Sequence, residues 1–249
     1  MMTISQLANP SVFMRLSGRI MPYLAVATVV FFALGLYMVV MAPPDYQQGE
    51  TVRIMFVHVP ASWLGMFGYS MIAISSIGSL VWRHPLADVS AKSAVPIGAA
   101  FTFLSLVTGS LWGKPMWGTY WVWDARLTSM LVLLFLYLGL IALWQSIEDY
   151  SRAGRAAAIL AIVGFINIPI IKFSVNWWNT LHQGSSITPM GSSAIDPALL
   201  RPLLVMAIAF TLLFVWIHMK AMRAEILKRR ASRIMLTQAQ PGVQWQPAE

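Results

Sequence analysis

The chain has 249 residues and a mean hydropathy of +0.67, and only 10% of its residues are charged. Soluble domains carry about 25% charged residues, so this composition excludes an ordinary soluble protein and predicts an integral membrane protein. The chain has no cysteine, which excludes disulfides and thiolate metal sites and leaves histidine as its strong ligand for transition metals.

Six apolar segments are long enough to cross about 30 Å of hydrocarbon as helices. They are residues 22–41, 59–82, 93–113, 127–147, 156–171 and 202–219. The first segment ends without an A-x-A cleavage site, so we interpret it as an uncleaved span. The fifth is short, and we expect it to continue beyond Lys172. The expected fold is an all-α membrane protein: a segment 1–20, a six-helix domain 21–219 and a basic tail 220–249.

Six spans place both termini on one side of the membrane. Twelve of the 17 lysines and arginines lie on that side. The other side carries only Arg53, Lys114, Arg126, Lys172 and Arg201. The positive-inside rule therefore predicts cytoplasmic termini, with the first, third and fifth loops facing outward. The net charge of +8 thus indicates topology rather than nucleic-acid binding.

The third loop, residues 112–128, is unusually rich in aromatic rings. It reads WGKPMWGTYWVWDARLT, and its tryptophans are Trp112, Trp117, Trp121 and Trp123. Tryptophans often anchor membrane proteins as an interfacial belt, which is one explanation. Belt residues are usually scattered over several helix ends, whereas these share one loop with Asp124 and Arg126. This arrangement favours a platform for a large flat ligand. We assign Trp177 and Trp178 to the belt or to packing.

Asp124 and Arg126 have a structural explanation as well. They could form an ion pair, with Asp124 favouring the positive end of the fourth helix. Outward cations that could meet the acidic groups of a ligand are Arg126, Arg53 and Lys114.

The four histidines fall on two sides. His58 and His182 are expected at the outer face with the tryptophans, whereas His84 and His218 lie at cytoplasmic helix ends and are expected to be structural. Imidazole is a standard axial ligand of haem iron, and a porphyrin is the flat ligand that the platform would suit. A His/Met pair using Met116 or Met190 is the alternative to two histidines.

Four motifs stand in an order that resembles the haem exporter protein C (CcmC) family, with its tryptophan-rich WWD domain. They are DYQQG at 45–49, HVP at 58–60, GKPMWGTYWVWDARLT at 113–128 and WWNTLHQGS at 177–185. The resemblance implies that His58 and His182 are the axial ligands of haem b. It also implies that the tryptophan loop holds the macrocycle, which assigns Trp117, Trp121, Trp123 and Asp124, with Trp112, Arg126 and Arg53 as further candidate contacts.

The resemblance further implies a role in c-type cytochrome biogenesis at the bacterial inner membrane. Non-covalent haem b would be presented on the periplasmic side to the haem chaperone CcmE, in an ABC transporter complex with CcmA, CcmB and CcmD. The chain has no G-x-x-x-x-G-K-[ST] motif, so we expect it to be neither an ATPase nor another enzyme. The alternatives are a transmembrane haem permease and a b-type haem electron carrier.

Overall fold

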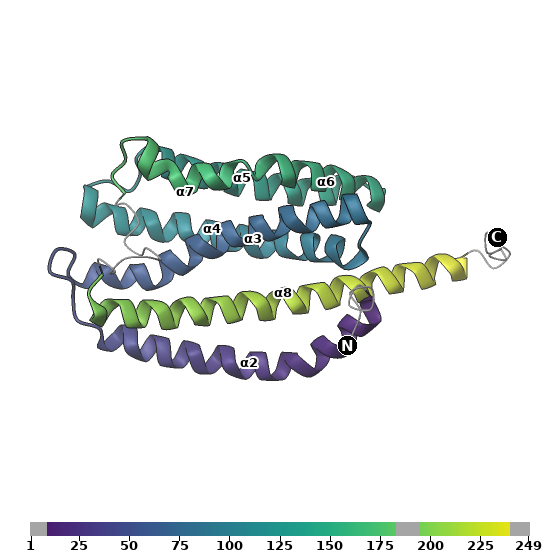
Figure 1. Ribbon diagram of the computed structural model, residues 1–249, viewed down its shortest axis with the longest axis horizontal. Helices are drawn as coiled ribbons and strands as arrows, with labels where there is room; N and C mark the ends of the chain where they lie inside the picture. Colours follow the sequence, from purple (N-terminus) through teal and green to yellow (C-terminus); the bar gives the residue numbers. More distant parts are fainter. Residues whose placement is uncertain (1–8, 183–194, 240–249) are drawn as a thin grey trace.

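The computed structural model describes residues 9–182 and 195–239, and this part of the chain is helical without any β-strand (Figure 1). Its elements are α2 (Pro10–Met41), η1 (Glu50–Ile54), α3 (Met55–Trp82), α4 (Pro85–Trp117), α5 (Ala125–Ser146), α6 (Tyr150–Gly164), α7 (Asn167–Trp177) and α8 (Pro197–Ala239). Six helical stretches in these residues are long and apolar enough to cross a membrane, with α6 and α7 forming one. The expected six-span fold is confirmed, and the fifth span continues beyond Lys172 to Trp177.

The hairpin of α3 and α4 occupies the centre of the bundle (Figure 1). Helices α5, α6 and α7 cover one side of the hairpin, and α8 covers the other. Helix α2 packs mainly along α8 at the outside. The two larger apolar cores lie between α3, α4 and α8 and between α3, α4, α5, α6 and α7. A smaller one joins α4 to α8 near the end with the termini.

Close packing within the second core depends on Tyr137 of α5. Its ring is fully buried, and its hydroxyl donates to the Gly65 carbonyl at 2.8 Å. Gly98 of α4 faces the same ring, and a Cβ atom there would overlap it. Small residues let transmembrane helices approach closely, so Gly65 and Gly98 allow one tyrosine to join three helices.

The turn between α3 and α4 is shorter than the connection 83–92 left between the expected spans 59–82 and 93–113. Only Arg83 and His84 separate the two helices, and Arg83 takes a left-handed conformation with φ 49°. Pro85 begins α4 because its fixed φ suits the first helical position. The His84 Nδ1 accepts from the Ala87 N–H, so this histidine caps the helix, as a structural residue should.

Both outer helices extend beyond the expected apolar spans. Helix α2 begins at Pro10, ahead of residue 22, and α8 continues as one helix to Ala239, past residue 219. Arg223 of α8 donates to the Ser17 hydroxyl and to the Met14 carbonyl of α2. These hydrogen bonds hold the two extensions together beyond the apolar spans.

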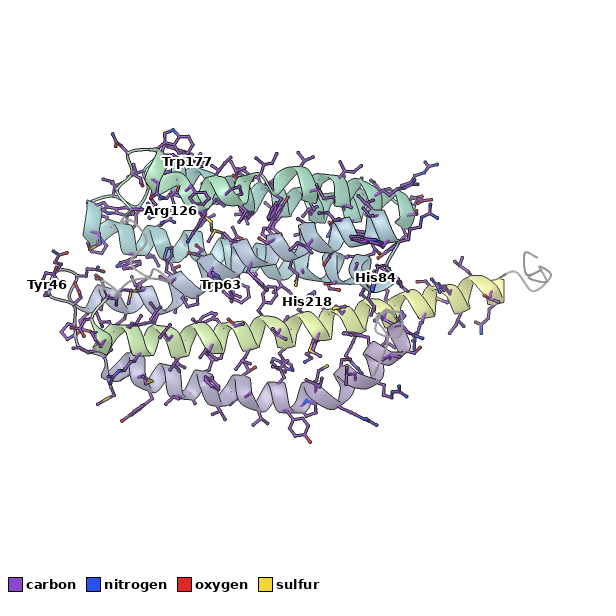
Figure 2. The ribbon with its side chains drawn as sticks, viewed as in Figure 1. Tyr46, Trp63, His84, Arg126, Trp177 and His218 are labelled. Atoms are coloured by element: carbon purple, nitrogen blue, oxygen red, sulfur yellow. The ribbon has the colours of Figure 1, made fainter. Side chains whose placement is uncertain are left out.

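The start of α2 and the end of α8 lie at the same end of the bundle (Figure 1). We call the opposite end the distal end. Tyr46, Arg126 and Trp177 lie there, whereas His84 lies toward the end with the termini (Figure 2). The first, third and fifth connections therefore share one end, as an even number of spans requires.

Candidate functional site

The tryptophan stretch is only partly a loop, which corrects the expectation for residues 112–128. Helix α4 continues through Trp117, Gly118 ends it with φ 74°, and α5 begins at Ala125. Pro115 does not break the helix, since bundled transmembrane helices tolerate proline. Gly113 leaves room for the Trp117 ring, whose Cε3 atom would lie 3.0 Å from an added Cβ. The glycine and proline therefore shape the end of a helix.

Each of the two distal histidines contacts one tryptophan at the end of α4. The rings of His58 and Trp112 lie 5.7 Å apart at 69°, and those of His182 and Trp117 lie 4.8 Å apart at 67°. Trp112 is itself held, because its Nε1 donates to the Gln48 side chain at 2.8 Å. Helix α4 thus brings together two histidines that are far apart in the sequence.

His58 is partly buried between α3 and α4. Its Nδ1 lies 3.0 Å from the Ser105 carbonyl oxygen and 3.2 Å from the Thr108 hydroxyl. A carbonyl oxygen only accepts, so Nδ1 carries the proton and Nε2 keeps its lone pair. The nearest hydroxyl to Nε2 is that of Ser62, at 3.5 Å. This tautomer leaves Nε2 able to bind a metal.

His182 is held by a carboxylate. Its Nδ1 lies 3.0 Å from Asp124 Oδ2, and Thr180 donates its hydroxyl proton to the same oxygen. The second oxygen, Oδ1, accepts from the Leu127 N–H at 2.8 Å and so caps α5. The expected capping role of Asp124 is confirmed. No direct ion pair joins Asp124 to Arg126 among the described residues; the carboxylate instead receives Thr180, the Leu127 N–H and His182.

The charge states follow from these contacts. Burial opposes ionisation of Asp124, but the hydrogen bonds from Thr180, the Leu127 N–H and His182 together lower its pKa below the ordinary value. Burial also lowers the pKa of His182, against the opposing effect of Asp124. An ionised carboxylate facing a neutral imidazole fixes the proton on Nδ1 of His182, and Nε2 again keeps its lone pair.

Arg126 completes the group around the histidines. It is close enough to interact electrostatically with both His58 and His182, and the two imidazoles are close enough to interact with each other. The structure therefore gathers His58, His182, Trp112, Trp117, Asp124 and Arg126 at the distal end.

Arg53 has a different role in the structure. Its guanidinium donates to the carbonyl groups of Val39, Val40 and Ala42, where α2 ends, and to the Glu50 carboxylate. Arginine commonly satisfies the last carbonyl groups of a helix in this way. Its proposed contact with a ligand stays a prediction, and Arg126 is the better placed cation.

The remaining loop tryptophans lie side by side. Trp121 and Trp123 pack at 5.4 Å, and Trp123 is 75% exposed. The Trp121 Nε1 is buried, and no acceptor among the described residues meets it. Trp177 and Trp178 contact each other and are half-exposed, as belt residues would be.

The two imidazoles suit a ligand, such as a porphyrin, that already supplies most of the donor atoms around its metal ion. In the described residues, no group of three or more His, Asp and Glu side chains could hold a bare metal ion. Two imidazoles can still fill the axial positions of a porphyrin iron. Met190, part of the His/Met alternative, lies outside the described residues.

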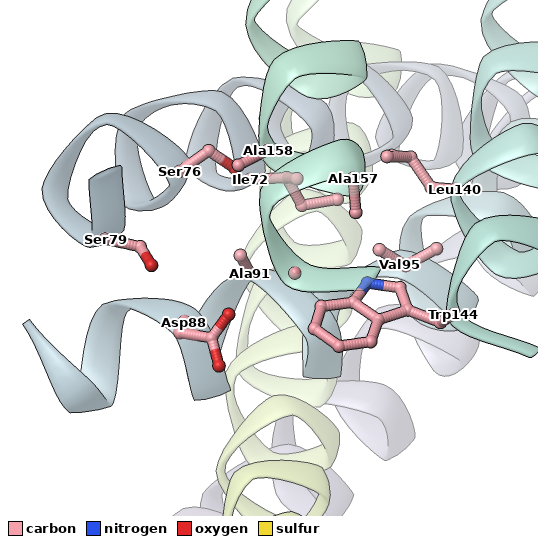
Figure 3. A pocket seen from close by; sticks show the side chains of 11 residues that line it. Ile72, Ser76, Ser79, Asp88, Ala91, Val95, Leu140, Trp144, Ala157 and Ala158 are labelled. Atoms are coloured by element: carbon pink, nitrogen blue, oxygen red, sulfur yellow. The ribbon is translucent and has the colours of Figure 1, made fainter. Parts of the chain in front are cut away.

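A small cavity between α3, α4, α5 and α6 is lined by residues that include Asp88, Val95 and Trp144 (Figure 3). Asp88 lies in the first turn of α4, so the cavity is near the end with the termini and away from His58 and His182. It holds about 10 Å³, enough for one water.

Sequence reasoning missed the residues that orient the histidines. Ser105 and Thr108 lie within an apolar span, where nothing in the sequence marks their contact with His58. Thr180 lies two residues before His182 inside the WWNTLHQGS motif, and this spacing was its only signal.

Comparison with known proteins gives a consistent result. The family model described as "Heme exporter protein C" matches residues 3–237. A protein of that name from Bradyrhizobium diazoefficiens is 63% identical, covering 96% of this chain and 90% of its own length. The Escherichia coli K12 protein of the same name is 50% identical over 92% of this chain and 94% of its own. A putative cytochrome c biosynthesis ccmC-like mitochondrial protein from Marchantia polymorpha is 48% identical over 82% of this chain and 87% of its own.

Proposed function

The chain belongs to the heme exporter protein C family, and from that premise we propose that it holds one non-covalent haem b at the distal end and presents it to an acceptor protein. His58 and His182 would be the axial ligands. The observation that carries the proposal is the pairing of two imidazoles from distant segments, each with its Nδ1 proton held by an acceptor and its lone pair on Nε2.

The other side chains at the distal end would each bind one part of the haem. Trp112 and Trp117 contact the two histidines, and Trp121 and Trp123 offer flat apolar surface on the adjoining loop. Arg126 would pair with a propionate, since guanidinium binds carboxylates bidentately. The chemistry of this chain would be presentation: it binds and orients the haem, and the acceptor supplies the reactive group.

We propose the haem chaperone CcmE as the acceptor, on the periplasmic side of the inner membrane, with CcmA, CcmB and CcmD as partners in an ABC-type complex. Support comes from the family and from the arrangement of the chain. The histidines lie at the end opposite the termini, which the excess of lysine and arginine assigns to the cytoplasm. We also propose that the chain is not itself an enzyme.

The test is purification in detergent followed by absorption spectroscopy with and without apo-CcmE. We expect bound haem in the purified protein and its loss from this chain to CcmE. The electron-carrier alternative predicts a haem that cycles in redox state and stays bound. The permease alternative predicts net haem flux by the isolated protein in vesicles. Either result without transfer to CcmE would contradict the proposal.

A further inference from the structure

The two candidate iron ligands are held by unequal partners. The Nδ1 of His182 faces a carboxylate, Asp124, at 3.0 Å, and Asp124 is buried. The Nδ1 of His58 faces the carbonyl oxygen of Ser105, which also accepts from the Thr108 hydroxyl at 3.2 Å. Among the described residues, His182–Asp124 is the only ion pair that involves either histidine. The Nδ1–H of His182 thus has a charged acceptor, whereas the Nδ1–H of His58 has a neutral acceptor that it shares with Thr108.

Thr180 fixes the stronger of these contacts. Its hydroxyl donates to Asp124 Oδ2 and accepts from the His182 N–H at 3.1 Å. One hydroxyl therefore ties the carboxylate to the backbone of the residue that the carboxylate orients. Oδ1 of Asp124 is meanwhile fixed by the start of α5. His182 lies outside the helices, and among the described residues its ring contacts Asp124, the Trp117 ring and Thr180 itself, whose Oγ1 lies 3.3 Å from Nδ1. Without Thr180 only the first two of these contacts would orient the ring.

On the basis of the proposed function, we infer that Thr180 is a positioning residue and that it makes His182 the firm axial ligand, leaving His58 as the ligand that exchanges on transfer. A carboxylate acceptor raises the basicity of an imidazole and strengthens its bond to the metal. The bond to His58 lacks this support. An incoming acceptor group would therefore replace His58 first, while His182 retains the iron until the transfer is complete.

The test replaces one threonine beside each histidine by valine and compares the two variants in the haem-loaded protein. Thr180→Val removes the hydroxyl at His182, and Thr108→Val removes the one at His58. A more basic ligand favours ferric over ferrous iron, and hydrogen bonding around the site tunes the potential. We expect Thr180→Val to lower the preference for ferric iron about tenfold, which raises the one-electron potential by about 59 mV. Thr108→Val should produce a smaller shift, because the Ser105 carbonyl remains.

Two further variants separate positioning from a general loss of structure. Thr180→Ser keeps the hydroxyl and should restore the wild-type potential. Thr211→Val removes a hydroxyl of α8 that donates to the Ala207 carbonyl at 2.7 Å, and it should not shift the potential. A Thr180→Ser variant that behaves like Thr180→Val, or equal shifts for Thr180→Val and Thr108→Val, would overturn the inference.

Haem retention gives a second readout. Outer partners of metal ligands typically contribute about 10–100-fold in affinity. We expect His58→Ala to release haem to apomyoglobin at least about tenfold more slowly than His182→Ala. If the wild type binds haem through both histidines but His58→Ala and His182→Ala release it equally fast, the two ligands are held equally. That result would refute this inference and leave the proposed function intact. A wild-type protein that binds no haem would refute both.

Discussion

At the residue scale, Asp124 serves the fold and the candidate site with one carboxylate. One oxygen caps α5 through the Leu127 N–H, and the other receives Thr180 and His182. The position of the His182 ring therefore depends on where a transmembrane helix begins. This dependence explains how His182, which lies outside the helices, can be positioned near His58, which lies within α3.

The pKa of His182 leads to a prediction for the unliganded protein. Burial lowers this pKa in the folded state below the ordinary value of 6.5. The contribution of His182 to stability should therefore be complete above pH 6.5 and decline as the pH falls below it through the lowered pKa. Thermal unfolding of the wild type and His182→Ala in detergent, from pH 8 to pH 5, measures this contribution. A wild type and a variant that lose stability in parallel would contradict it.

The loop tryptophans lead to a second prediction at this scale. Replacing Trp117, Trp121 and Trp123 together by alanine should lower haem retention at least tenfold while the protein still inserts. Stacking on an aromatic ring contributes about 1–3 kcal/mol per nucleobase, and we apply that scale to a porphyrin. The control is a Trp177→Ala, Trp178→Ala variant, which removes half-exposed rings. Unchanged haem content in the triple variant would reduce the loop to an interfacial belt.

At the element scale, α4 determines the arrangement of the site. It runs from the cytoplasmic turn that the sequence predicts to the distal end, packs along α3, and carries Trp112 and Trp117 in its last turns. Its contact with α3 sets the position of His58, and its link to α5 carries Asp124. The α3–α4 packing should therefore control both stability and haem binding.

Gly98 tests this packing. A valine at position 98 would overlap the Tyr137 ring, which cannot move because its hydroxyl is bonded to Gly65 and its surroundings are fully buried. Overpacking of this kind costs about 1–3 kcal/mol. We expect Gly98→Val to lower the unfolding temperature in detergent and the haem content together. Gly139→Ala, which meets only the flexible Leu160 side chain, is the control. Equal unfolding temperatures for the two variants would contradict this account.

Much of the fold and part of the site could be predicted from the sequence. Apolar length alone identified the six spans, and the order of the spans grouped His58 with His182 on one side of the membrane. The helical ends were missed for a physical reason: Pro115 and Gly113 weaken a helix locally, but contacts with neighbouring helices outweigh this preference. The extension of α8 beyond residue 219 could not be predicted from apolar length, because contacts across helices hold it: Arg223 bonds to Ser17 and Arg229 pairs with Asp88. Thr180 was missed because its contact with Asp124 joins residues 56 positions apart.

At the scale of the whole molecule, the bundle separates two kinds of chemistry. The end with the termini carries ion pairs such as Lys92–Glu225 and Arg229–Asp88, which tie α8 to α4. The distal end carries His58, His182, Trp112, Trp117 and Arg126. A haem handled at the distal end is therefore kept away from the basic residues at the other end.

This separation gives a topology prediction. A reporter fused after Glu249 should be active in the cytoplasm, and one inserted near Ser192, outside the described residues, should be active on the external side. The reason is the excess of lysine and arginine on the side of the termini. Alkaline phosphatase and green fluorescent protein fusions measure the two locations. The opposite pattern would place the histidines in the cytoplasm and exclude delivery of haem to a periplasmic acceptor.

The central claim is that His58 and His182 bind the same haem iron, and one absorption spectrum tests it most directly. The haem-loaded wild type and the control His84→Ala should show six-coordinate, low-spin haem. The variant His58→Ala, His182→Ala should lose that spectrum, because Nε2 of each histidine is the proposed axial ligand. A wild-type spectrum in the double variant would contradict the account, whatever the role of the tryptophans.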